Sequence, residues 1–128
     1  MWHNEFCRIV RADEPDYPGF MRVILTAHVK EMTDLSPAEQ HALMHVVLTT
    51  EAALREVMAP DKVNLASLGN VVPHLHWHVI PRFADDPHFP NPMWGERKRA
   101  APHAAQADLD AQLAAALSRR LARARETE

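Results

Sequence analysis

The most regular pattern of apolar and polar positions in the chain lies at residues 36–58. Residues of one helical face recur there at intervals of three and four, and most are apolar: Leu43, Val46, Val47, Thr50, Leu54 and Val57. Ser36 can cap the helix, Pro37 suits its first position, and Glu39 completes a capping box. The sequence therefore predicts one long amphipathic helix that begins at Pro37 and ends before Pro60.

Shorter segments on both sides of this helix have the character of β-strands. They alternate between apolar and polar residues or are rich in β-branched residues: residues 5–12, 20–29, 62–68 and 74–83. A connection with prolines and a glycine, residues 13–19, joins the first two segments. Strands before and after one long helix predict an α+β fold, in which the helix covers one face of an antiparallel sheet.

The last part of the chain loses the strand pattern. Residues 84–103 contain several prolines and no periodicity, so we expect an irregular segment that wraps the body through Phe89 and Trp94. In residues 106–126 a leucine recurs at every fourth position: Leu109, Leu113, Leu117 and Leu121. This pattern predicts a C-terminal helix with a narrow leucine stripe. The stripe can dock on its own domain or on a second copy, and the sequence leaves both open.

Composition limits the class of protein. The 128 residues suffice for one hydrophobic core, which we divide into a domain at 1–95 and a linker with the C-terminal helix at 96–128. The net charge of −3 argues against a nucleic-acid partner. Because no apolar run approaches the roughly 20 residues of a membrane span, we expect no membrane partner. The single cysteine, Cys7, cannot form an internal disulfide, which favours the reducing cytoplasm.

The segment HLHWHVI carries an unusual alternation. Side chains two residues apart on a strand point to the same face, so His74, His76 and His78 form a row, while the apolar residues between them face the other way. As surface residues, three histidines in a row would add little stability, because protonated rings repel one another. The row therefore indicates chemistry rather than structure.

Two kinds of chemistry use such a row. Imidazole is a common zinc ligand, but His74 and His78 are about 13 Å apart along a strand, so one tetrahedral ion would need other ligands. The candidates for these ligands are His28, His88 and Asp85. Alternatively, a neutral imidazole is a nucleophile that can carry a phosphoryl or nucleotidyl group covalently. Its neighbours in the row can then hydrogen-bond the phosphate or protonate the leaving group.

The loop before the row supports the phosphate interpretation. Its sequence GNVV places successive backbone N–H groups at Gly69, Asn70 and Val71, directly before the histidines. Successive N–H groups in a turn can cradle an anion. The loop is therefore a candidate phosphate-binding element.

These segments resemble the histidine triad (HIT) superfamily of nucleotidyl hydrolases and transferases. HLHWHVI is similar to its pattern His-x-His-x-His followed by two apolar positions. PDYPGF and MRVILTAHV resemble its Pro-Gly turn, central strand and histidine, and DLSPAE resembles the start of its long helix. NLASLGN resembles the Asn-bearing strand and loop before the triad. The resemblance runs from about Phe6 to Arg82.

The resemblance implies a HIT-like fold and hydrolysis or transfer at a nucleotide phosphate ester, anhydride or phosphoramidate through a nucleotidyl-histidine intermediate. It implies that His76 is the nucleophile, that His78 contacts the phosphate or leaving group, and that His74 orients the central ring. The binding residues it suggests are Asn64, Gly69, Asn70, Val71 and His28. The family is usually homodimeric and needs no metal or other cofactor. The runner-up among enzymes is a dinucleoside polyphosphate hydrolase. The alternative from a different class is a non-catalytic nucleotide- or metal-binding protein of the same fold.

The chain departs from the family pattern near the nucleoside. It begins about where the strand beside the nucleotide begins, so we expect the family's first hairpin to be absent. The position of the family's ribose-binding Asp or Asn is Ala12, with Asp13 adjacent as a substitute, and the family's Pro-Gly-His turn ends in Phe20. We therefore expect weak discrimination between ribo- and deoxyribonucleotides, unless Asp13 takes over the ribose contact.

Overall fold

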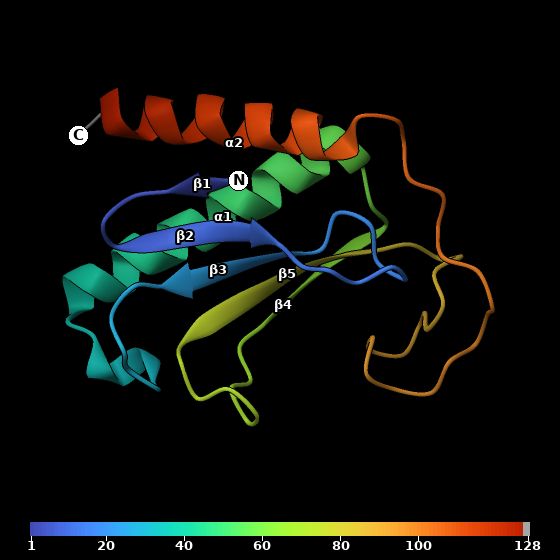
Figure 1. The fold of residues 1–128 in the computed structure, drawn as a ribbon, viewed down its shortest axis with the longest axis horizontal. Coiled ribbons are helices and arrows are strands. Elements are labelled where there is room, and N and C mark those ends of the chain that lie inside the picture. Colours follow the sequence, from blue (N-terminus) through green and yellow to red (C-terminus); the bar gives the residue numbers. More distant parts are fainter. Residues whose placement is uncertain (127–128) are drawn as a thin grey trace.

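A single antiparallel sheet organises the chain. The structure is a computed structural model that describes residues 1–126, so the end of the predicted 96–128 segment lies outside the described residues. The strands are β1 (Trp2–His3), β2 (Cys7–Arg11), β3 (Met21–Leu25), β4 (Lys62–Ala66) and β5 (His76–Arg82), in the order β1-β2-β3-β5-β4. The helices are α1 (Pro37–Met58) and α2 (Leu109–Glu126), and both lie on one side of the sheet (Figure 1). The predicted α+β fold is confirmed.

Helix α1 forms as the sequence predicts, because its start signal is complete. The Ser36 hydroxyl accepts a hydrogen bond from the Glu39 backbone N–H at 3.2 Å, and the Glu39 carboxylate accepts one from the Ser36 N–H at 2.9 Å. The helix ends at Ala59, whose φ of 48° is left-handed and whose N–H bonds the Arg55 carbonyl. Pro60 follows directly. The capping box and the stop signal together set both ends of the helix.

The main core lies between α1 and the sheet. Alternate residues of the strands face the helix and are fully buried, among them Ile9, Val23 and Val79. They pack against the buried face of α1, which includes Leu43 and Val47. The residues between them in sequence face the opposite side of the sheet, which carries no helix (Figure 1). One face of the sheet thus stabilises the fold, and the other is free to form a site.

Helix α2 docks on its own domain. The stripe of Leu109, Leu113, Leu117 and Leu121 is buried, and α2 contacts α1 and β1. Arg119 adds a salt bridge to Glu56 of α1. The leucine stripe therefore completes the domain that contains the sheet, which answers the question that the sequence leaves open. Of the helices within residues 1–126, none combines the length and the apolar character needed to cross a membrane.

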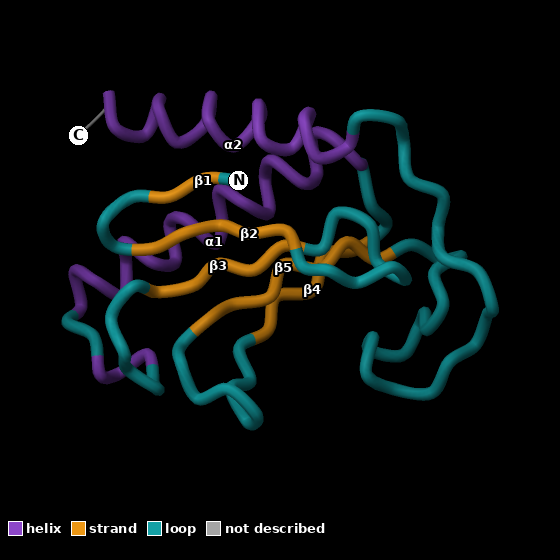
Figure 2. Tube along the Cα trace, viewed as in Figure 1, coloured by secondary structure: helices purple, strands orange, loops and turns teal. Residues whose placement is uncertain are grey.

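The irregular segment at 84–103 forms loops that extend beyond the end of β5 (Figure 2). A small second core forms there from Ala12, Tyr17, Phe20 and Ile80, with Met93 of the irregular segment packed against it. The prediction that Trp94 wraps onto the body is wrong, because its side chain is 57% exposed. Polar contacts also hold the segment, among them the ion pair between Arg82 and Asp86.

The strand boundaries differ from the prediction in several places. A short strand, β1, precedes β2 and pairs with it, so a small hairpin is present where none was expected. Strand β3 ends at Leu25, well before residue 29. Strand β5 begins at His76 and passes through Pro81, which is tolerated because β3 pairs with β5 only as far as Val79.

Candidate active site

Strand register brings the predicted histidines together with side chains from β2 and β3. On the helix-free face, Ile24 lies opposite His76 and Arg22 lies opposite His78. In the next strand, Arg8 lies opposite Ile24. A cavity of about 870 Å³ lies over these rows. Residues far apart in sequence therefore share one site.

Most of the predicted site residues line this cavity. Those that do are His28, Gly69, Asn70, Val71, His74, His76 and His78. The apolar part of the lining includes Ile24, Leu68 and Val72. The cavity thus combines imidazole rings, loop backbone and an apolar rim, which is the combination that small-molecule sites show.

Asn64 and Asp13 lie outside the lining. Asn64 shares the helix-free face with the histidines, but its Oδ1 accepts a 2.8 Å hydrogen bond from Arg82 Nη1. Asp13 is exposed beyond the end of β2, and Ala12 is buried in the small second core. The residue that β2 does contribute to the cavity is Arg8.

The hydrogen bonds of His76 define its free nitrogen. Its Nδ1 lies 2.6 Å from the backbone carbonyl oxygen of His74. Because a carbonyl can only accept, Nδ1 carries the proton and donates it. In the neutral ring the lone pair is then on Nε2. The ring is held in the tautomer that a nucleophile requires.

His74 acts on His76 through its backbone, and its own ring is held by two contacts. His74 Nε2 lies 2.6 Å from the Leu25 carbonyl oxygen, so this nitrogen is the donor. His74 Nδ1 is then the acceptor for His28 Nδ1, at 3.1 Å. His28 and Leu25 therefore fix the His74 ring, and the His74 backbone carbonyl in turn fixes the His76 ring. The strand β5 starts at His76, so His74 is fixed by these contacts rather than by strand pairing.

His78 lies in a less polar environment. Its ring packs edge-on against His76, with centroids 5.0 Å apart, and against Phe20, at 5.5 Å. Burial, then the charges of His76 and Arg22, lowers the pKa of His78 from 6.5 to about 4. Its Nδ1 is buried and has no partner among the described residues. His78 is therefore uncharged near neutral pH, with Nε2 left to contact a ligand.

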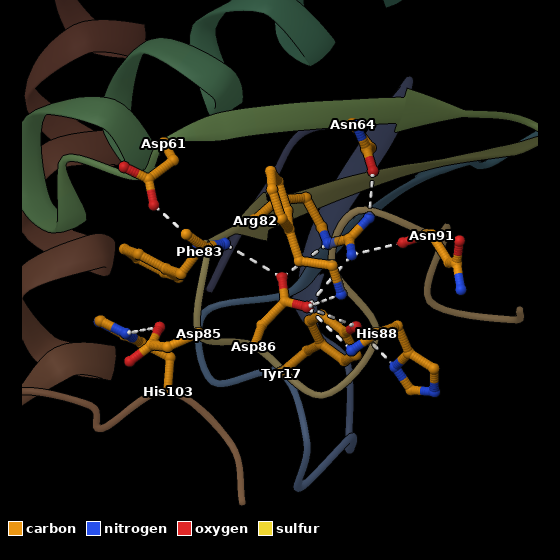
Figure 3. A network of polar contacts seen from close by, with 12 residues as sticks. Tyr17, Asp61, Asn64, Arg82, Phe83, Asp85, Asp86, His88, Asn91 and His103 are labelled. Atoms are coloured by element: carbon orange, nitrogen blue, oxygen red, sulfur yellow. Dashed lines mark hydrogen bonds and ion pairs between the residues drawn. The ribbon is translucent and has the colours of Figure 1, made fainter. Parts of the chain in front are cut away.

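Of the additional zinc ligands that the sequence suggests, His28 lies at the triad, but His88 and Asp85 have partners elsewhere. His88 Nδ1 lies 2.7 Å from the Tyr17 hydroxyl, and Asp85 pairs with His103 at 2.7 Å (Figure 3). Within residues 1–126 no three potential metal ligands converge. The positions of these donors therefore give the metal hypothesis no support.

The sequence interpretation missed the two arginines of the cavity. Arg22 Cζ lies 5.2 Å from the centroid of the Phe20 ring, a cation–π distance. In the sequence, each arginine is only a basic residue at a polar position of a predicted strand. The strand register is what shows that Arg8 and Arg22 lie beside the histidines.

A family model described as HIT domain matches residues 1–85. The AP-4-A phosphorylase of Mycobacterium tuberculosis is 30% identical over 81 residues, which cover 59% of this chain and 42% of that protein. The asymmetrical bis(5'-nucleosyl)-tetraphosphatase of Schizosaccharomyces pombe is 31% identical over 74 residues, which cover 54% of this chain and 41% of that protein. The chain thus spans about two fifths of the length of these curated relatives.

Solved structures agree with this assignment. A histidine triad protein from Bradyrhizobium japonicum superposes with a TM-score of 0.75 and 30% identity, covering 92% of this chain and 86% of that chain. One from Marinobacter aquaeolei gives 0.73 and 26%, covering 94% and 86%. The sheet with its helix-free face and the histidines at the start of β5 thus place the chain in the histidine triad class. The chain belongs to the HIT domain family.

Proposed function

We propose that the protein is a hydrolase or nucleotidyl transferase that acts on nucleotide phosphates through a covalent intermediate on His76. The observation that carries this proposal is the 2.6 Å hydrogen bond from His76 Nδ1 to the His74 carbonyl, which leaves Nε2 unprotonated beside the cavity. A neutral imidazole with a fixed tautomer is a competent nucleophile toward phosphorus.

The proposed reaction has two displacements. In the first, His76 Nε2 forms a bond to the phosphorus, and the bond from phosphorus to the leaving oxygen or nitrogen breaks. His78 contacts the departing group, which takes up a proton from solvent. In the second, water attacks the nucleotidyl phosphorus and releases a proton to solvent, the N–P bond breaks, and the nucleoside monophosphate leaves as His76 returns to its neutral form. With an acceptor in place of water, the same step is a transfer.

Binding residues follow from the lining of the cavity. We assign the loop amides of Gly69, Asn70 and Val71 to the phosphate and the apolar rim to the base. The two curated relatives are named for dinucleoside tetraphosphates, which supports a nucleotide substrate. Because Ala12 is buried away from the cavity, we expect weak discrimination between ribose and deoxyribose, within about tenfold in kcat/KM.

The direct test is to trap the intermediate. The protein is mixed with adenosine phosphoramidate or diadenosine tetraphosphate, quenched at alkaline pH during turnover, and digested for mass spectrometry. We expect an adenylyl group on the peptide that contains His76, and none in His76→Asn. Turnover without any trapped adduct, in a protein that forms product in one step, would contradict the covalent mechanism.

Two measurements address the alternatives. A non-catalytic nucleotide binder of the same fold would bind AMP but form no product from either substrate. A metal enzyme would lose activity on exhaustive chelation and regain it with zinc, whereas we expect chelation to leave the rate unchanged, because the imidazole needs no metal-activated water. We also propose a homodimer, which sedimentation velocity tests.

A further inference from the structure

The cavity beside the triad concentrates positive charge on its β2–β3 side. Its lining includes the two cationic side chains Arg8 and Arg22 and, among the residues that the structure describes, no aspartate or glutamate. The chain as a whole has a net charge of −3, so this positive charge is a local feature. A cavity lined by charges of one sign and by apolar walls favours a ligand of the opposite charge.

Neither arginine has an ion-pair partner among the described side chains. Five other arginines do have carboxylate partners: Arg11, Arg82, Arg97, Arg119 and Arg120. A guanidinium presents a rigid fork of N–H donors that matches two phosphate oxygens. Arg8 and Arg22 therefore offer the cavity donors that the protein uses elsewhere to neutralise carboxylates.

Sheet register places both arginines near the reacting centre. Arg22 is directly opposite His78, one strand spacing away, or about 5 Å. Arg8 is two strand spacings from His76, about 10 Å, in the same row. Phe20 lies between Arg22 and His78: the Arg22 guanidinium lies over its ring, and the His78 ring packs against it edge-on. A phosphate on His76 would thus have cationic groups next to it.

We propose that Arg22 and Arg8 form a second anion site, which binds phosphates adjacent to the reacting one and selects polyphosphate-bridged nucleotides over substrates with a single phosphate. The proposal rests on the proposed function, since His76 must hold the reacting phosphate. A phosphoramidate contacts only the triad and the loop amides. A tetraphosphate chain contacts these groups and both arginines.

A binding experiment tests the site without any chemistry. Tripolyphosphate and orthophosphate are titrated by calorimetry into the wild type, Arg22→Gln, Arg8→Gln and the control Arg11→Gln. Arg11 lies on β2 but faces the helix side, where it pairs with Asp110. Arg11→Gln therefore removes the same charge as the cavity variants without changing the cavity. We expect each cavity variant to weaken tripolyphosphate binding about tenfold, with Arg11→Gln unchanged. Equal weakening in Arg11→Gln, or none in the cavity variants, overturns the proposal.

A specificity experiment tests the same site during turnover. The ratio of kcat/KM for diadenosine tetraphosphate to that for adenosine phosphoramidate is measured in the same proteins and in Arg22→Lys. We expect Arg22→Gln to lower this ratio about tenfold, and Arg22→Lys to retain part of it, because the charge remains without the fork. A loss that is equal for both substrates overturns the proposal.

The two failures are distinguishable. If the wild type turns over both substrates and the ratio does not move, the anion site is wrong and the proposed function stands. If the wild type turns over neither substrate, the proposed function is wrong, and tripolyphosphate binding still decides whether the arginines form an anion site.

Discussion

The helix-free face of β5 carries His76 and His78 in its first half and Arg82 at its end. These polar groups differ in whether their nitrogen atoms have hydrogen-bond partners. Arg82 is 3% exposed, and it donates to Asp86, to Asn64 and to the Asn91 carbonyl (Figure 3). His78 leaves a buried nitrogen without a partner among the described residues. Two parts of one strand face therefore differ in whether their polar groups are satisfied.

The contacts of Asp86 with Arg82 and with backbone N–H groups form a structural cluster, which we call the staple. Burial works to raise the pKa of Asp86, but Arg82 and backbone N–H donors outweigh it and lower the pKa to about 2. The donors include the N–H groups of Phe83, His88 and Phe89, at 3.0, 3.0 and 2.8 Å. The contacts from Arg82 and Phe83 tie the segment at 84–103 to the end of β5, and those from His88 and Phe89 fix the course of the segment itself. A buried charge that is fully paired indicates structure, whereas unpaired groups around a cavity indicate binding.

The largest expected effect is on catalysis at the triad. We expect His76→Ala to lower kcat/KM for adenosine phosphoramidate by at least about a thousandfold, or about 4 kcal/mol, because the two-step route needs the nucleophile. The free energy of unfolding should change by about 1 kcal/mol or less, since the ring packs in no core. Retention of more than about a tenth of the wild-type rate would show that another group is the nucleophile.

The next effect is on stability at the staple. Arg82→Met leaves Asp86 buried without its partner and should lower the free energy of unfolding by about 3–5 kcal/mol in urea titrations. Arg22→Gln, on the same face, should change it by about 0.5 kcal/mol or less. The double variant Arg82→Met with Asp86→Asn should recover part of the loss, because the amide oxygen still accepts the backbone N–H groups but no unpaired charge is buried. Equal destabilisation by Arg82→Met and Arg22→Gln would remove the distinction between the two regions.

A smaller effect concerns His28 as a positioning residue. His28→Phe removes the donor to His74 Nδ1, so we expect kcat to fall about tenfold, or ~1.4 kcal/mol, with KM little changed. Nitrogen NMR of the imidazole rings should show His74 losing its single tautomer, and His28→Gln, which retains a donor, should restore part of the rate. An unchanged His74 tautomer in His28→Phe would contradict this role.

The last effect separates the two regions by pH. The lowered pKa of His78 means that the unfolded chain binds this proton more readily, so its share of stability is lost as pH falls from 6.5 toward about 4. The share of Asp86 is lost only at lower pH, between 3.8 and about 2. Urea unfolding at several pH values should show a weaker dependence above pH 4 in His78→Asn, with the lower window unchanged. Identical profiles for His78→Asn and the wild type would contradict the assignment.

Much of the fold was predictable because its signals are local. The capping box of α1 joins Ser36 and Glu39, three residues apart, and its apolar face repeats with the helical period. The histidine row follows from the two-residue period of a strand, which puts His76 and His78 on one face of the sheet. Hydrogen bonds and periodicities between near neighbours leave a mark in the sequence itself.

Contacts between distant segments left no such mark. The leucine stripe of α2 predicted a buried face, but only the packing of α2 on α1 showed which surface buries it. The segment at 84–103 has no period, and its course depends on long-range contacts such as the ion pair between Arg97 and Asp16. Nothing in the local sequence pairs these two residues.

The sequence by itself therefore determined both helices, four of the five strands and the position of the histidine row. Tertiary structure alone decided which other groups surround that row. Arg8 and Arg22 lie beside the row because antiparallel register aligns β2, β3 and β5. Asn64 instead accepts a hydrogen bond from Arg82 in the staple. Register and side-chain pairing depend on the packing of the whole sheet, so no single segment encodes them.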